Sequence, residues 1–265
     1  MGVAVVRLGQ VSVELEDEGR GEPVLLVHGF PTTRALWKGV APALVQAGYR
    51  AIAPDLVGYG GSSCPAGVEP DMASQAGWLV GLLDALGIER ATVVAHDVGT
   101  AAAQILVARA PERVRGLVLM DGVHAGEWAM EAAAPIQTWQ EPARLLRVVV
   151  RGIRTGSGSP ARLPEETVRE MLAPYQGEEG GAKLIRAARA LHPRQVVEIM
   201  PALRERRVRA LVMWGEHDTY LPAEAVGRPL AELLGAELVL LPGGHFVPLD
   251  CPREVAAGVL RFLAE

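Results

Sequence analysis

Short apolar segments alternate with longer helical patterns along most of this chain, and this alternation constrains the fold more than any other feature. Continuous apolar runs begin at Pro23 ("PVLLVHG"), Tyr49 ("YRAIAPD") and Ala91 ("ATVVAH"). Such runs are typical of strands buried on both faces of a parallel sheet. Helical stretches separate them, and one of these has Asp71 as a cap and Gly87 as a stop. The pattern predicts an α/β fold, with a mostly parallel sheet and helices on both faces.

The pattern changes in the middle of the chain. From about residue 122 to about residue 207, helical periodicity is interrupted by Pro and Gly and strands are scarce; strand–helix alternation then resumes. Because the fold is complete without this segment, we expect a helical cap over residues 122–207. The core would then be formed by residues 1–121 and 208–265. Within the core, helices are predicted over residues 35–47, 98–110, 223–234 and 252–264.

Charge and cysteine content narrow the classes of partner. The net charge is −5 at pH 7, which does not favour nucleic acid or an anionic membrane. No apolar run approaches the about 20 residues of a membrane span, and the N-terminus lacks a signal-peptide pattern. Cys64 and Cys251 lie far apart and form no metal-spaced pair. We expect a cytoplasmic protein with reduced thiols, no metal and no cofactor; the oligomeric state is not indicated.

Acidic and imidazole side chains follow most of the predicted strands. Because ligands of open parallel sheets bind beyond the carboxyl ends of the strands, these residues are expected to meet at one edge. The sequence places there His28 and Phe30 in "HGFP", Asp55 in "DLVGYGGSS", His96 and Asp97, Glu216 to Asp218, and His245 in "GGHF".

These motifs together resemble those of the α/β-hydrolase family. Its nucleophile elbow has the pattern G-x-S-x-G, with the triad in the order nucleophile, acid, histidine. The segment Ala95–Gly99 resembles this elbow with Asp97 in the nucleophile position. "WGEHDTYLP" resembles the acid loop and implies Asp218, and "GGHFVPLD" resembles the histidine loop and implies His245. The resemblance covers nearly the whole chain, although the middle segment matches only as a generic cap.

A carboxylate at the elbow changes the chemistry that the family position can support. With an ordinary pKa near 3.9, Asp97 is ionised at pH 7 and needs no base to become a nucleophile. Attack on an ester carbonyl would give a reactive anhydride, whereas displacement at a saturated carbon gives an alkyl ester. His245, oriented by Asp218, would then activate water to hydrolyse that ester. The backbone amides of Phe30 and Val98 are the expected oxyanion hole.

Epoxide hydrolases and haloalkane dehalogenases are the two subfamilies that Asp97 resembles most. Dehalogenases usually hold the halide with a Trp after the nucleophile, and this chain has Val98 there; they tend to have Asn or Trp where Phe30 stands. Epoxide hydrolases share the "HD" pair and "HGFP", but they need phenols that protonate the opening epoxide. Tyr175 in the predicted cap and Tyr220 beside the acid loop are the candidates. The resemblance therefore favours an epoxide hydrolase-like activity on a small apolar organic substrate, with a haloalkane dehalogenase-like activity as the alternative.

Several assignments stay open at this stage. Glu216 and Asp121 compete with Asp218 for the role of triad acid. The candidates for lining the substrate pocket are Trp128, Trp139, Tyr175 and His96. An esterase-type activity, in which the pair of carboxylate and histidine acts as a base, and a non-catalytic ligand-binding protein are the remaining hypotheses.

Overall fold

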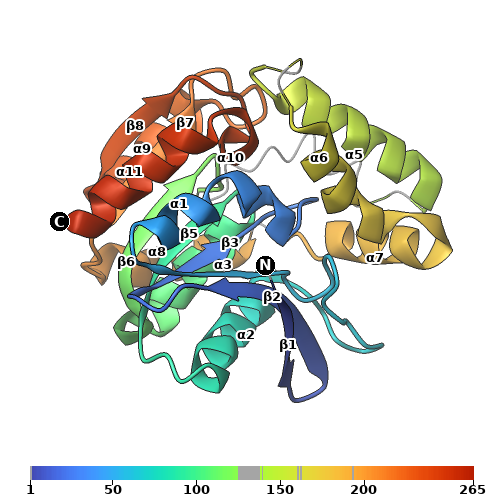
Figure 1. Cartoon of the computed structure of the whole chain (residues 1–265), viewed down its shortest axis with the longest axis horizontal. Helices are drawn as coiled ribbons and strands as arrows, with labels where there is room; N and C mark the ends of the chain where they lie inside the picture. The colour runs from blue at the N-terminus through green and yellow to red at the C-terminus, as the bar shows by residue number, and fades with distance from the viewer. Residues whose placement is uncertain (1, 125–137, 139, 160, 162, 193) are drawn as a thin grey trace.

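The computed structural model describes residues 2–124, 138, 140–159, 161, 163–192 and 194–265, and a single sheet lies at its centre (Figure 1). Among these residues the sheet consists of β1 (Val3–Leu8), β2 (Val11–Glu18), β3 (Pro23–Val27), β4 (Arg50–Pro54), β5 (Ala91–His96), β6 (Val114–Met120), β7 (Ala210–Gly215) and β8 (Glu237–Leu241). Their order is β1-β2-β4-β3-β5-β6-β7-β8. β2 is antiparallel to β1 and β4, and every other pair is parallel. The predicted mostly parallel sheet is confirmed.

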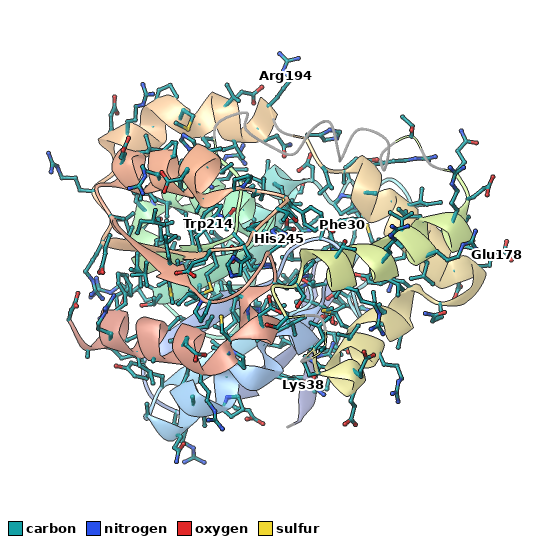
Figure 2. The ribbon with its side chains drawn as sticks, turned by 90° about the horizontal axis from the view of Figure 1, so that it is seen from above. Phe30, Lys38, Glu178, Arg194, Trp214 and His245 are labelled. Atoms are coloured by element: carbon teal, nitrogen blue, oxygen red, sulfur yellow. The ribbon has the colours of Figure 1, made fainter. Side chains whose placement is uncertain are left out.

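Helices cover both faces of this sheet, because its central strands are apolar on both sides. One face carries α1 (Ala41–Gln46) and α11 (Pro252–Ala264), which pack against each other. The other face carries a row in which neighbours are in contact: α2 (Met72–Ala85), α3 (Gly99–Arg109), α8 (Arg194–Glu205) and α9 (Arg228–Leu234). Seen from above, these two layers lie on opposite sides of the sheet (Figure 2). The short helices η2 (Pro111–Arg113) and α10 (Val247–Asp250) lie in connections between strands and longer helices.

Two predicted helices are each split in the structure. Residues 35–47 form a 3₁₀ helix, η1 (Arg34–Gly39), followed by α1, and residues 223–234 form a π turn, η5 (Ala223–Gly227), followed by α9. In both cases a proline, Pro42 or Pro229, stands in the first turn of the second helix. Proline has no N–H to donate back to the preceding turn, so it begins a helix more readily than it continues one.

The segment between β6 and β7 supplies helices that lie beside the sheet. These are α5 (Pro142–Gly156), α6 (Glu165–Leu172), η4 (Ala173–Tyr175) and α7 (Gly177–Arg189), at the right of Figure 1. We call residues 142–189 the α5–α7 segment. α8 belongs to the same stretch of sequence, but it packs against α3 in the helix layer. No helix in the described part of the chain is long and apolar enough to cross a membrane.

Candidate active site

Asp97 lies at the sharp turn between β5 and α3, where the backbone has to reverse direction. Its φ is 52°, in the left-handed region, which Asp tolerates better than most residues. The turn has room only because its neighbours are small: a Cβ on Gly99 would come 2.3 Å from the carbonyl oxygen of His28. A Cβ on Gly29 would likewise come 2.3 Å from Asp97 Oδ1. The loop after β3 therefore approaches the carboxylate closely, and the Phe30 amide donates to Asp97 Oδ1 at 2.6 Å.

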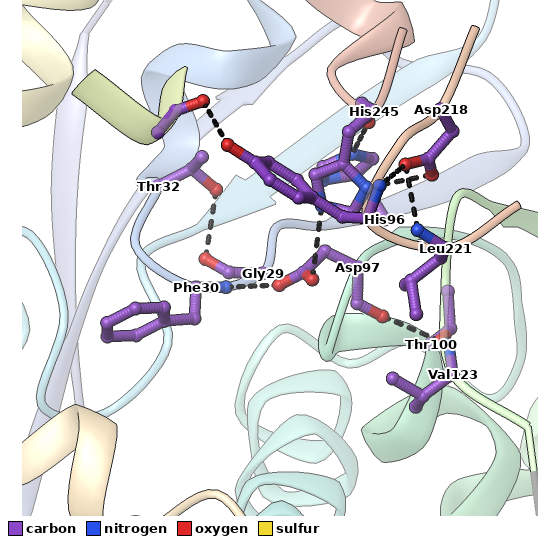
Figure 3. A network of polar contacts seen from close by, with 12 residues as sticks. Gly29, Phe30, Thr32, His96, Asp97, Thr100, Val123, Asp218, Leu221 and His245 are labelled. Atoms are coloured by element: carbon purple, nitrogen blue, oxygen red, sulfur yellow. Dashed lines mark hydrogen bonds and ion pairs between the residues drawn. The ribbon is translucent and has the colours of Figure 1, made fainter. Parts of the chain in front are cut away.

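His245 faces the other oxygen of the same carboxylate, as Figure 3 shows. Its Nε2 lies 3.3 Å from Asp97 Oδ2, and its Nδ1 lies 2.9 Å from Asp218 Oδ2. The second oxygen of Asp218 accepts the backbone N–H groups of Tyr220 and Leu221. This geometry fixes which nitrogen of His245 is turned toward Asp97. The three residues that the family resemblance implies as a triad thus lie together.

The two rival acids lie in different surroundings. Glu216 is exposed, whereas Asp121 is fully buried at the end of β6 and accepts the Gly215 amide at 2.7 Å. Burial, followed by the negative charge of Asp218, raises the pKa of Asp121 well above its ordinary value. A carboxyl with a raised pKa carries its negative charge less readily, so it is the weaker partner for an imidazolium. The distances favour Asp218 as the partner of His245.

The charges around His245 set its protonation. Burial lowers the pKa of His245, but the charge and hydrogen bond of Asp218 and the contacts with Asp97 outweigh it and raise that pKa well above its ordinary value. In the free protein, the two carboxylates therefore favour the protonated ring of His245. His96 is the opposite case, because burial and the nearby His245 lower its pKa to about 4.

Two of the four predicted pocket residues lie in the described part of the structure. Trp128 and Trp139 lie outside the described residues. Tyr175 is fully buried and donates to the Thr32 carbonyl at 3.2 Å, so its phenol points to the loop after β3. His96 is also fully buried, and its Nε2 lies 2.7 Å from the backbone oxygen of His245. A neutral ring nitrogen can hydrogen-bond to a carbonyl oxygen only as an N–H donor. His96 therefore donates a hydrogen bond to the backbone of the histidine loop.

Tyr220 packs edge-on against His245, with ring centroids 5.3 Å apart. Its hydroxyl donates to the Gly152 carbonyl at 2.8 Å and lies 2.8 Å from Thr155 Oγ1, both in α5. Within the described residues, no group of three or more His, Cys, Asp or Glu side chains is placed to hold a metal ion.

Comparison with known proteins is decisive at the level of the family. A family model described as "alpha/beta hydrolase fold" matches residues 22–252. The chain belongs to the α/β-hydrolase fold family. This confirms the family and the fold that the motifs predict.

Relatives of this α/β-hydrolase include proteins named epoxide hydrolase, haloalkane dehalogenase and 2-hydroxy-6-oxo-2,4-heptadienoate hydrolase. An epoxide hydrolase of Caballeronia sordidicola is 42% identical over 108 residues, which are 40% of this chain and 33% of that protein. Haloalkane dehalogenase 2 of Mycobacterium bovis is 28% identical over 258 residues, covering 92% of this chain and 89% of that one. The crystal structure of haloalkane dehalogenase DbeA from Bradyrhizobium elkani has a TM-score of 0.84 at 26% identity, covering 99% of both chains. These names support a hydrolase.

Proposed function

We propose that this α/β-hydrolase acts through an alkyl ester on Asp97, and that its activity is epoxide hydrolase-like. The observation that carries the proposal is the orientation of one carboxylate: Oδ1 receives the Phe30 amide and Oδ2 faces His245 Nε2. This carboxylate also stands at the strained turn after β5, which is the nucleophile position of the family. Its two oxygens are placed for two different tasks.

In the first step Oδ2, which is not held by the loop amide, attacks a saturated carbon of the substrate. A C–O ester bond forms and the C–O bond of the epoxide breaks, so the departing oxygen stays attached to the product and takes a proton. Tyr175 and Tyr220 are the candidate proton donors. Both phenols donate to backbone carbonyls in the free protein, so either one would exchange that acceptor for the substrate oxygen.

In the second step water attacks the Asp97 carbonyl carbon while His245 accepts its proton. Negative charge then develops on Oδ1, where the Phe30 amide already lies at 2.6 Å. When the intermediate collapses, the bond between this carbon and Oδ2 breaks, and Oδ2 leaves with the product and takes the proton from His245. The second candidate donor is the amide of Val98, the N-cap residue of α3. Amides at the start of a helix have no acceptor within the helix. Losing one such donor costs about 2.7 to 4 kcal/mol in other enzymes.

Ester formation also prepares His245 to act as the base. The free carboxylate of Asp97 helps to raise the pKa of His245, and that charge disappears when the ester forms. The pKa then falls, which favours the neutral ring that accepts a proton from water. Asp218 remains to hold the ring and to stabilise the imidazolium that results.

The residues around Asp97 favour an epoxide over an alkyl halide. A free halide ion needs N–H donors from side chains near the nucleophile, and Val98 and Phe30 offer apolar side chains at the two family positions. The ring of Phe30 also points away from Asp97 (Figure 3). We infer that the α5–α7 segment acts as the cap over a small apolar substrate.

Trapping of the ester tests this proposal. His245→Gln removes the base while leaving Asp97 able to attack. The variant should therefore gain the whole mass of an epoxide, or only the alkyl group of a bromide, because bromide leaves. Styrene oxide, 1,2-epoxyhexane and 1-bromohexane, followed by intact-mass spectrometry, separate the epoxide from the halide activity. Adducts with the bromide alone would favour the dehalogenase-like alternative. Absence of any adduct, with p-nitrophenyl ester turnover that vanishes in Asp97→Ala, would favour an esterase-type activity. Binding without any product would indicate a ligand-binding protein.

A further inference from the structure

Asp250, five residues after His245, joins two segments that are remote in sequence. Its Oδ1 accepts the Ser157 hydroxyl at 2.5 Å, and its Oδ2 accepts the Gly158 amide at 2.8 Å. The same Oδ2 also accepts the Gly244 amide at 2.8 Å. One carboxylate therefore binds both the C-terminal end of α5 and the histidine loop.

The two segments are in direct contact around these hydrogen bonds. The backbone N–H of His245 donates to the Gly156 carbonyl at 2.7 Å. A Cβ on Gly244 would come 2.2 Å from that same carbonyl oxygen, and a Cβ on Gly158 would come 2.6 Å from the Gly244 nitrogen. The histidine loop thus has the end of α5 as one wall, and a shift of one segment displaces the other.

A local structural role does not account for the orientation of Asp250. It precedes α11 by two residues, where an acid often caps a helix, but Cys251 is the N-cap and no side chain caps this helix. The three groups that it accepts are neutral and lie outside α11. A surface ion pair would leave the backbone amides free, whereas this carboxylate takes two of them.

We propose that Asp250 is a positioning residue, which sets the place of His245 by fastening the histidine loop to the end of α5. The inference rests on the proposed function, in which His245 is needed for hydrolysis of the ester and not for its formation. Loss of Asp250 should therefore slow hydrolysis of the ester and leave its formation unchanged. A general loss of folding would lower both steps together.

The test compares Asp250→Ala with Asp250→Asn. Alanine removes all three acceptor contacts. Asparagine can keep them, because its oxygen can accept both amides and its NH₂ can donate to Ser157. In single-turnover experiments with an epoxide that alkylates His245→Gln, the ester should form at the wild-type rate in Asp250→Ala. Its hydrolysis should be about tenfold to a hundredfold slower, so that the adduct accumulates. Asp250→Asn should restore most of the hydrolysis rate.

Each outcome decides a separate point. If His245→Gln traps no ester from any substrate, the proposed function fails and this role of Asp250 falls with it. If His245→Gln traps ester while Asp250→Ala hydrolyses it at the wild-type rate, only the role of Asp250 is overturned. If Asp250→Ala does not fold, Ser157→Ala removes one contact alone and should slow the same step to a smaller extent. An unchanged hydrolysis rate in a folded Ser157→Ala would then contradict the inference.

Discussion

Asp97 and His245 lie at the same edge of the sheet, but different parts of the molecule hold them. Asp97 sits between β5 and α3, and the amide that contacts its carboxylate comes from the loop after the neighbouring strand β3. The backbone of His245 is held by His96 on one side and by Gly156, at the end of α5, on the other. The proposed nucleophile is thus placed by the sheet, and the proposed base partly by a helix outside it. Changes in the α5–α7 segment should therefore affect ester hydrolysis more than ester formation.

Removal of the nucleophile gives the largest expected effect. Asp97→Ala should lower turnover by about 10,000-fold or more, as removal of a nucleophile does in other triads, and should give no mass adduct. Alanine tolerates a φ of 52° less well than Asp does, so a thermal unfolding curve is the control. Residual turnover within tenfold of the wild type would mean that Asp97 does not react.

Loss of the hydrogen bond between His96 and the backbone of His245 should slow ester hydrolysis, the step that needs the proposed base. His96→Leu leaves the buried carbonyl of His245 without its donor, which costs about 1 to 3 kcal/mol. If the transition state bears this whole cost, ester hydrolysis should be slower by about 5-fold to 150-fold. His96→Gln is the matched control, because its NH₂ group can occupy the place of Nε2. Equal hydrolysis rates in the two variants would show that this hydrogen bond is dispensable.

The pH dependence of ester hydrolysis gives the pKa of His245 in the alkyl ester, for comparison with its pKa in the free protein. Because the alkyl ester removes the charge of Asp97, the pKa of His245 in the ester should lie below that in the free protein. Hydrolysis needs the neutral ring, so its rate should rise about tenfold per pH unit below the ester-form pKa and then level off. Single-turnover rates give this pKa, and NMR titration gives that of the free protein. A kinetic pKa equal to or above the free value would contradict the proposed switch.

Sequence patterns predict the part of the site that the sheet creates. The strand ends that carry His28, Asp97, Asp218 and His245 follow from apolar runs and from the turn motifs after them. These features are local, since a few consecutive residues define both a buried strand and the turn that ends it. The close approach of the loop after β3 is also visible in the sequence, because the "HGFP" motif supplies Gly29 where a side chain would clash.

The remaining contacts depend on chain segments that sequence patterns do not bring together. Ser157 and Asp250 are 93 positions apart, and a serine in a Gly-rich loop carries no sign of its partner. Tyr175 belongs to the predicted cap, but only the three-dimensional arrangement reveals that its hydroxyl is bound to Thr32. The boundaries of the cap at residues 122 and 207 stay a prediction. α8 shows the difficulty, because a helical pattern does not reveal which layer the helix joins.

Substitution of Asp121 should have the smallest effect on turnover of the changes considered. It tests how Asp121 differs from Asp218, the other acid near His245. Its raised pKa means that the folded protein binds a proton that the unfolded chain releases above about pH 4. Stability should therefore fall with rising pH from about pH 4 up to the folded-state pKa, by at most about 1.4 kcal/mol per pH unit. Asp121→Asn keeps an oxygen for the Gly215 amide and removes the titration. Urea unfolding at pH 5 and pH 8 should show the variant gaining stability relative to the wild type at the higher pH, with turnover nearly unchanged. A stability difference that is equal at the two pH values would mean that Asp121 is ionised in the folded protein, and it would then compete with Asp218 as the acid.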